Sequence, residues 1–168
     1  KGGKTVLLDE VIQQVESYQP RYVTVTGGEP LAQPACVLLL RRLCDQGYSV
    51  SLETSGALDV EKVDSRVTLV MDLKVPSSTE VHRNRYQNIS FLKSSDQVKF
   101  VIADRRDFEW AMEVMAEYDL PARAQILFSP SHGVLDNRSL ADWIVEENVP
   151  VRFQVQLHKY IWQEERGR

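Results

Sequence analysis

The chain has 168 residues, of which 43% are hydrophobic, and its formal net charge is -4 at pH 7. This length and hydrophobic content suffice to bury one sizeable core, and they favour a single domain over residues 1–168. The small negative charge, without a basic stripe, argues against direct binding to nucleic acid. No apolar run is long enough to span a bilayer and no tripartite signal opens the chain, so we expect a cytoplasmic protein that inserts into no membrane.

Apolar periodicity predicts that strands and helices alternate along the chain. Leu8, Val11 and Val15 repeat at helical spacing, with Asp9 as the expected N-cap and Pro20 as the end of this first helix. The later expected helices lie at residues 34–46, 105–118 and 139–147. The expected strands lie at residues 22–26, 49–53, 67–72, 97–102, 124–128 and 152–156.

This alternation indicates an α/β fold in which helices pack against a parallel sheet that is open or curled into a partial barrel. Because the strands are short and apolar, we expect helices to bury them on both faces. Residues 76–95 are polar and lack a strand period, so they are expected to form a loop with one helical turn.

The cysteines and histidines suggest no metal site. Cys36 and Cys44 lie within an apolar helical stretch and match no CxxC pattern, which favours buried thiols. His82, His132 and His158 make no zinc-like set, so no mononuclear metal held by these residues is expected. The absence of a P-loop and of a GxGxxG fingerprint argues against an ATPase or a dinucleotide dehydrogenase.

Residues able to do chemistry follow the ends of the apolar strands, at positions 26–30, 53–56, 72–74, 129–133 and 156–159. Since the carboxyl ends of parallel strands share one rim, these groups should converge on one site. Each group also has a plainer explanation. Gly27 and Gly28 could form only a tight turn, Asp72 and Lys74 could be a surface ion pair, and His158 could be a hydrogen-bonded residue at a strand end.

Thr-Gly-Gly-Glu-Pro at residues 26–30, after a strand and before a helix, resembles the turn with which radical S-adenosylmethionine (SAM) enzymes hold the amino group of SAM. Further motifs are Ser-Leu-Glu-Thr-Ser-Gly at 51–56, Asp-Leu-Lys at 72–74, Val-Lys-Phe-Val at 98–101, Leu-Phe-Ser-Pro at 127–130 and Gln-Leu-His-Lys-Tyr at 156–160. In this order, and over nearly the whole chain, they resemble the 7-carboxy-7-deazaguanine synthases, lyases of queuosine biosynthesis.

The resemblance implies a partial (β/α) barrel of mainly parallel strands, of the radical SAM type. It implies a ring contraction of 6-carboxy-5,6,7,8-tetrahydropterin to 7-carboxy-7-deazaguanine with loss of ammonia. A reduced [4Fe-4S] cluster would cleave SAM to a 5'-deoxyadenosyl radical, and Mg2+ would assist the rearrangement. An electron donor such as flavodoxin and a homodimeric state are implied as well.

The resemblance also assigns residues. SAM would contact Gly27, Gly28, Glu29, Asp72, Leu73, Lys74, Ser129, Pro130 and Ser131. Other members show Ser-Pro-Lys where this chain has Asp-Leu-Lys, so only Lys74 of that trio matches. The pterin substrate would contact Thr26 and His158.

Two features depart from the family pattern. The CxxxCxxC loop that binds the cluster is absent before Thr26, so we expect an N-terminal segment with the cluster and Mg2+ ligands to be missing, and the chain as given to be inactive without it. At the other end, residues 161–168 continue beyond the point where several relatives stop.

Two other functions stay open at this point. One is a radical SAM activase that modifies a partner protein, since short enzymes of that kind share the same glycine-rich turn. The other is a module that binds SAM or a pterin without a cluster and without chemistry. The motif at residues 156–159 favours the synthase over the activase.

Overall fold

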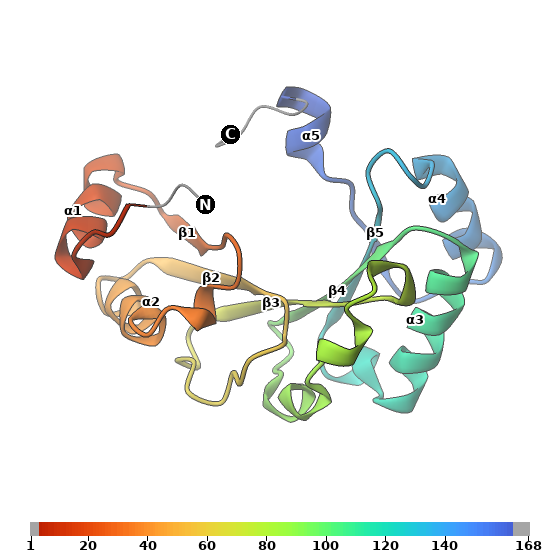
Figure 1. Cartoon of the computed structure of the whole chain (residues 1–168), viewed down its shortest axis with the longest axis horizontal. Helices are drawn as coiled ribbons and strands as arrows, with labels where there is room; N and C mark the ends of the chain where they lie inside the picture. The colour runs from red at the N-terminus through yellow and green to blue at the C-terminus, as the bar shows by residue number, and fades with distance from the viewer. Residues whose placement is uncertain (1–3, 163–168) are drawn as a thin grey trace.

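The computed structural model describes residues 4–162, with the backbone alone at residues 158 and 160. It contains a six-stranded sheet in which every neighbouring pair of strands is parallel and the strands follow one another in chain order (Figure 1). The strands are β1 (Tyr22–Val25), β2 (Ser49–Thr54), β3 (Thr68–Leu73), β4 (Gln97–Ile102), β5 (Gln125–Pro130) and β6 (Arg152–Phe153). The helices are α1 (Leu8–Tyr18), α2 (Cys36–Asp45), α3 (Arg105–Glu117), α4 (Asn137–Glu146) and α5 (Leu157–Trp162).

Helices α1 to α4 lie on the outer side of a curved sheet, and α5 lies above its inner side. Figure 1 shows α1 and α2 beside β1 and β2, and α3 and α4 beside β4 and β5. Right-handed crossovers between strands taken in chain order place every connecting helix on the same face of a sheet. The expected α/β partial barrel of parallel strands is therefore confirmed, and its inner face is left for a site.

The expectation that helices bury the strands on both faces is wrong for β2, β3 and β4, whereas β5 is buried at every position after Gln125. In β3 and β4 buried residues alternate with partly exposed ones, and β2 follows the same alternation. The outward side chains of β2 to β4 pack under the helices, whereas the inward ones include Glu53, Asp72 and Lys99. A partial barrel has a concave inner face that no helix covers, so those positions accept polar side chains.

The outward side chains form two apolar clusters. One lies beneath α1 and α2 and contains Leu40 and Leu52, and the other lies beneath α3 and α4. In the second cluster Phe100, Phe108 and Phe128 are fully buried, and the ring of Phe128 meets the other two edge-on at centroid separations of 5.7 and 5.6 Å. Edge-to-face packing of this kind adds to the free energy of burial.

The first helix begins differently from the prediction. Its N-cap is Leu7, whose backbone N–H donates to the Glu10 carboxylate at 3.0 Å, and not Asp9. Asp9 lies in the first turn and pairs with Arg42 of α2 at 2.6 Å. A carboxylate in the first turn of a helix is favourable because it lies beside the positive end of the helix dipole. Asp9 therefore does mark the start of α1, but the helix begins earlier than predicted.

Residues 76–95 are more ordered than the single helical turn that was expected. They contain three 3₁₀ segments, at Pro76–Ser78, Val81–Arg83 and Tyr86–Phe91. The fully buried Asn88 side chain accepts from the Val60 N–H and donates to the carbonyls of residues 56 and 58. One amide thus replaces a run of regular backbone hydrogen bonds, which periodicity in the sequence cannot reveal.

The last strand is shorter than expected. β6 contains only Arg152 and Phe153, and Gln154 adds one more backbone hydrogen bond to β5 at Phe128. His158, expected at a strand end, lies on α5, and its side chain is outside the described residues. Within residues 4–162, no helix has the length and apolar character needed to cross a membrane.

Candidate active site

The turn after β1 exposes its backbone. Gly27 and Gly28 have φ angles of 96° and 59°, which side chains other than glycine rarely adopt. An added Cβ at either residue would meet no atom within 4 Å, so the space beside this turn is open. The glycines therefore do more than make a tight turn possible, because they leave the main chain accessible to a ligand.

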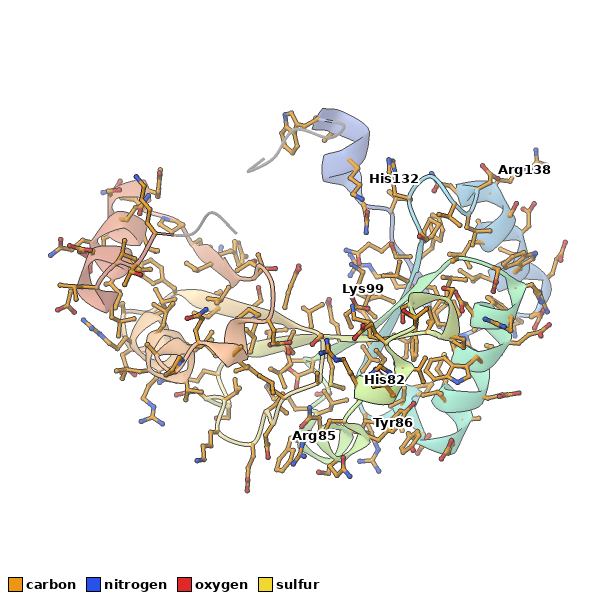
Figure 2. All side chains as sticks on the ribbon, in the orientation of Figure 1. His82, Arg85, Tyr86, Lys99, His132 and Arg138 are labelled. Carbon is orange, nitrogen blue, oxygen red and sulfur yellow. The ribbon has the colours of Figure 1, made fainter. Side chains whose placement is uncertain are left out.

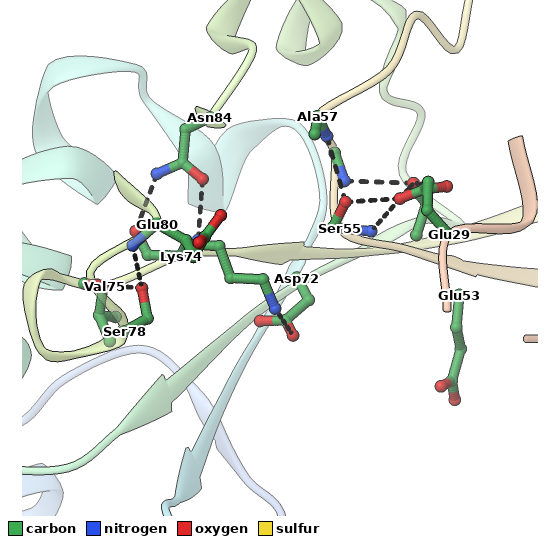
Figure 3. Close-up of polar contacts among 12 residues, drawn as sticks. Glu29, Glu53, Ser55, Ala57, Asp72, Lys74, Val75, Ser78, Glu80 and Asn84 are labelled. Atoms are coloured by element: carbon green, nitrogen blue, oxygen red, sulfur yellow. Dashed lines mark hydrogen bonds and ion pairs between the residues drawn. The ribbon is translucent and has the colours of Figure 1, made fainter. Parts of the chain in front are cut away.

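The Glu29 carboxylate ties this turn to the end of β2 (Figure 3). The Thr54 hydroxyl donates to both of its oxygens, at 2.9 and 3.0 Å, and the Ser55 N–H donates at 2.9 Å. The Ser55 hydroxyl and the Leu31 N–H donate as well. A carboxylate with this many donors is rigidly held, and it fixes the glycine turn relative to the neighbouring strand.

A cavity of about 130 Å³ lies at the carboxyl ends of the first four strands. At its edge the Thr26 hydroxyl donates to the Glu53 carboxylate at 3.1 Å. The cavity is lined by Thr26, Gly28, Glu53, Thr54, Ser55, Val70, Asp72, Lys74 and Lys99. The predicted convergence of strand-end groups is therefore confirmed for Thr26, Gly28, Asp72 and Lys74.

Lys74 is held at both its backbone and its ammonium group (Figure 3). Its Nζ lies 2.7 Å from Asp72 Oδ2, and both side chains are about 30% exposed, at 30% and 28%. The Asn84 side chain accepts from the Lys74 N–H and donates to the Lys74 carbonyl, both at 2.8 Å. The Asp72–Lys74 ion pair therefore lies in a site wall and is more than a solvated surface contact.

A second cavity, of about 430 Å³, adjoins the first one across Asp72 and Lys74. Ser77, Ala103 and Ser131 also line it. Behind its wall, the fully buried Ser129 hydroxyl has no hydrogen-bond partner among the described residues. An unsatisfied buried hydroxyl is unusual, and at a site it is available to a ligand or an ordered water molecule.

Some predicted site residues do not point into these cavities. Leu73 belongs to the apolar core beneath α3, and Pro130 is buried in register with Ile102, which is also a core residue. Only their main chains can face a ligand. His82, in the 3₁₀ segment Val81–Arg83, and His132, in a turn, are both exposed and line neither cavity.

Glu53, Thr54 and Ser55 line the site as the predicted convergence of residues 53–56 requires, although no ligand was assigned to them, whereas Lys99 was not among the predicted strand-end groups. Polar residues at alternate positions were the available signal, as in Ser49, Ser51 and Glu53 of β2. Lys99 likewise lies between two apolar residues of β4, which marks an inward position on a strand.

The cysteines do not fit a cluster. Cys36 and Cys44 are 4% and 8% exposed, and burial raises the pKa of both thiols, which disfavours the thiolate form that binds iron. Both pack in the core beneath α2, as expected from the sequence. Among the described residues no group of three His, Cys, Asp or Glu side chains is placed to hold a metal ion.

This architecture, with an open glycine turn and a polar cavity at the carboxyl ends of parallel strands, is that of a partial-barrel α/β protein with a ligand site on its inner face. The crystal structure of QueE from Escherichia coli superposes with a TM-score of 0.70 at 19% identity, over 90% of this chain and 64% of that one. The structure of Streptococcus suis SuiB bound to the precursor peptide SuiA gives a TM-score of 0.63 at 12% identity, over 97% and 46%. No family model matches the sequence.

Curated proteins identify the family. The 7-carboxy-7-deazaguanine synthase of Chlorobaculum tepidum is 39% identical over 95% of this chain and 74% of its own length. The synthase of Koribacter versatilis is 36% identical over 96% of this chain and 78% of its own length. The chain belongs to the 7-carboxy-7-deazaguanine synthase family, which confirms the resemblance read from the sequence motifs.

Proposed function

We propose that this chain carries the SAM and substrate sites of an enzyme that converts 6-carboxy-5,6,7,8-tetrahydropterin to 7-carboxy-7-deazaguanine in queuosine biosynthesis. The observation that carries the proposal is the polar cavity beside the Gly27–Gly28 turn, at the carboxyl ends of four parallel strands. Membership of the family supports the reaction, and it favours the synthase over an activase acting on a partner protein.

The described residues offer hydrogen-bonding and charged groups that complement those of SAM. The exposed main chain of Gly27 and Gly28 offers carbonyl oxygens to an ammonium group, and Lys74 offers a positive charge to a carboxylate. Ser131 offers a hydrogen bond from the wall of the larger cavity, and the unpartnered Ser129 hydroxyl is buried behind that wall. When bound beside a reduced cluster, SAM supplies the hydrogen-abstracting radical.

Glu29 was expected to contact SAM directly, and we propose instead that it acts through the glycine turn. Its carboxylate already accepts hydrogen bonds from Leu31, Thr54 and Ser55, so it acts chiefly by holding the glycine turn in place. Direct contact between this carboxylate and the SAM amino group is secondary to that function. Asp72 similarly orients Lys74, while Leu73 and Pro130 contribute only main-chain atoms.

Thr26 and His158 are proposed to face the pterin. Thr26 lies at the mouth of the smaller cavity, where its hydroxyl is already oriented by Glu53. His158 lies on α5, which Figure 1 shows above the inner side of the sheet.

The cluster and Mg2+ do not have ligands among the described residues, and their proposal rests on the family alone. The same holds for a flavodoxin-like electron donor, a homodimeric state and a cytoplasmic location.

Asn84→Ala should weaken SAM binding by about 3-fold to 10-fold, because the amide that fixes both backbone groups of Lys74 is lost. Calorimetry on the reconstituted full-length protein measures this effect. Asn137→Ala is the matched control, since Asn137 is exposed at the start of α4. A fall in unfolding temperature with unchanged SAM affinity would contradict the positioning role.

The proposed function is tested with the full-length protein after anaerobic reconstitution with iron and sulfide. Carboxytetrahydropterin, SAM, reductant and Mg2+ should yield 7-carboxy-7-deazaguanine and ammonia. SAM cleavage without this product would exclude the synthase, and a dominant glycyl-radical partner in a pull-down would then identify an activase. Tight SAM binding without any iron would instead indicate the cluster-free module.

A further inference from the structure

Lys99 is a positively charged residue of the inner face for which neither the family motifs nor the cofactors provide a function. It lies near the middle of β4, on the side of the sheet away from α2 and α3 (Figure 2), and it lines the smaller cavity. It is partly buried. Burying such a charge is unfavourable unless an anion compensates it.

No carboxylate in the described part of the chain is paired with Lys99. Lys99 takes part in none of the ion pairs or side-chain hydrogen bonds found there. Its neighbour in register, Asp72, is already paired with Lys74 at 2.7 Å, and Glu53 accepts from Thr26. The residue in register on the other side is Leu127, which is apolar. The cavity therefore contains a lysine that no described carboxylate contacts: Asp72 is paired with Lys74, and Glu53 is hydrogen-bonded to Thr26.

The register of the sheet places Lys99 one row away from Lys74 and Ser129, two of the residues proposed to hold SAM. Lys99 lies in the row that joins Asp72, Lys99 and Leu127. Val101 and Ser129 form the next inward row toward the carboxyl ends, and Lys74 follows β3 at that level. Lys99 is thus one row deeper in the concave face than Lys74 and Ser129, although it shares its row with Asp72 and its cavity with Gly28.

We propose that Lys99 binds the carboxylate of the substrate and of the ring-contracted product, and so sets the orientation of the ring in the cavity. This inference rests on the proposed function. The family name itself states that the product carries a carboxylate. A single charged donor at a partly buried position distinguishes a carboxylated ring from the same ring without that group.

The experiment uses the reconstituted full-length enzyme and three probes: 7-carboxy-7-deazaguanine, 7-deazaguanine and SAM. Lys99→Met keeps the length of the side chain but removes the charge. It should weaken binding of the carboxylated ring by about 10-fold to 100-fold, the size expected for losing a charge-assisted hydrogen bond. Binding of 7-deazaguanine and of SAM should change less than about 2-fold, because neither needs Lys99.

Lys99→Gln should give the same selective loss, and thermal unfolding verifies that both variants fold. Lys62→Met, at an exposed loop position, is the matched control and should bind all three probes like the parent enzyme. Equal weakening of both rings, a loss of SAM affinity, or unchanged binding of the carboxylated ring would each overturn the inference. If the parent enzyme neither bound nor formed the carboxylated ring, the proposed function itself would fail.

Discussion

Replacing Glu29 with glutamine should lower the affinity for SAM by about 10-fold to 100-fold. An amide has one acceptor oxygen where the carboxylate has two, and its NH2 group would face hydroxyl and N–H donors of Thr54 and Ser55. The turn at Gly27 and Gly28 would then lose its attachment to β2. Because the open main chain of that turn is the proposed ammonium site, its displacement affects binding directly.

This prediction is measured by anaerobic calorimetry with SAM on the reconstituted full-length protein, together with urea unfolding. The free energy of unfolding should fall by about 1 to 3 kcal/mol. Glu113→Gln is the control, because Glu113 is exposed on α3 and makes no described ion pair. SAM affinity equal to that of the parent protein would show that the turn does not depend on Glu29.

Replacing Asp107 with alanine should reduce the free energy of unfolding by about 2 to 4 kcal/mol. Asp107 is fully buried on α3, and its carboxylate accepts from the Ser77 N–H at 3.0 Å, the Ser77 hydroxyl and the Ala103 N–H at 3.0 Å. Alanine would leave these donors without a partner. Donors unsatisfied in a buried setting cost more than the net value of the hydrogen bonds that they lose.

Urea unfolding of the full-length protein measures the loss, and Glu113→Ala on the same helix should change stability by less than about 0.5 kcal/mol. Ser77 and Ala103 both line the larger cavity, so the variant should also loosen that wall. Asp107→Asn, which keeps the volume and one acceptor, should lose less. Stability of Asp107→Ala within error of the parent would mean that water replaces the carboxylate without cost.

Local patterns were enough for much of the fold. The strand at Gln97–Ile102 was predicted at its observed bounds, because a short apolar alternation stands there between polar segments. The remaining expected strands and helices were found with boundaries shifted by a few residues. Since helices that alternate with strands have few ways to pack, the parallel sheet followed from their order.

Contacts between distant segments were beyond local reasoning. The 3₁₀ segment that contains Asn88 and the short last strand depend on partners far along the chain. The N-cap at Leu7 was missed although its partner, Glu10, is only three residues away. The prediction that helices cover both faces of the strands was wrong because it depended on the curvature of the whole sheet. A run of apolar residues does not tell whether a sheet stays flat between two helix layers or curls around a concave face.

By itself, the sequence determined the glycine turn at residues 26–30, the order of the strand-end motifs and hence the family. The tertiary structure alone decided that Glu29 is bound by Thr54 and Ser55, and that Lys99 lies beside Asp72. The physical reason is strand register. Which side chains become neighbours across a curved parallel sheet depends on the alignment of strands 25 or more residues apart, and no local propensity encodes that alignment.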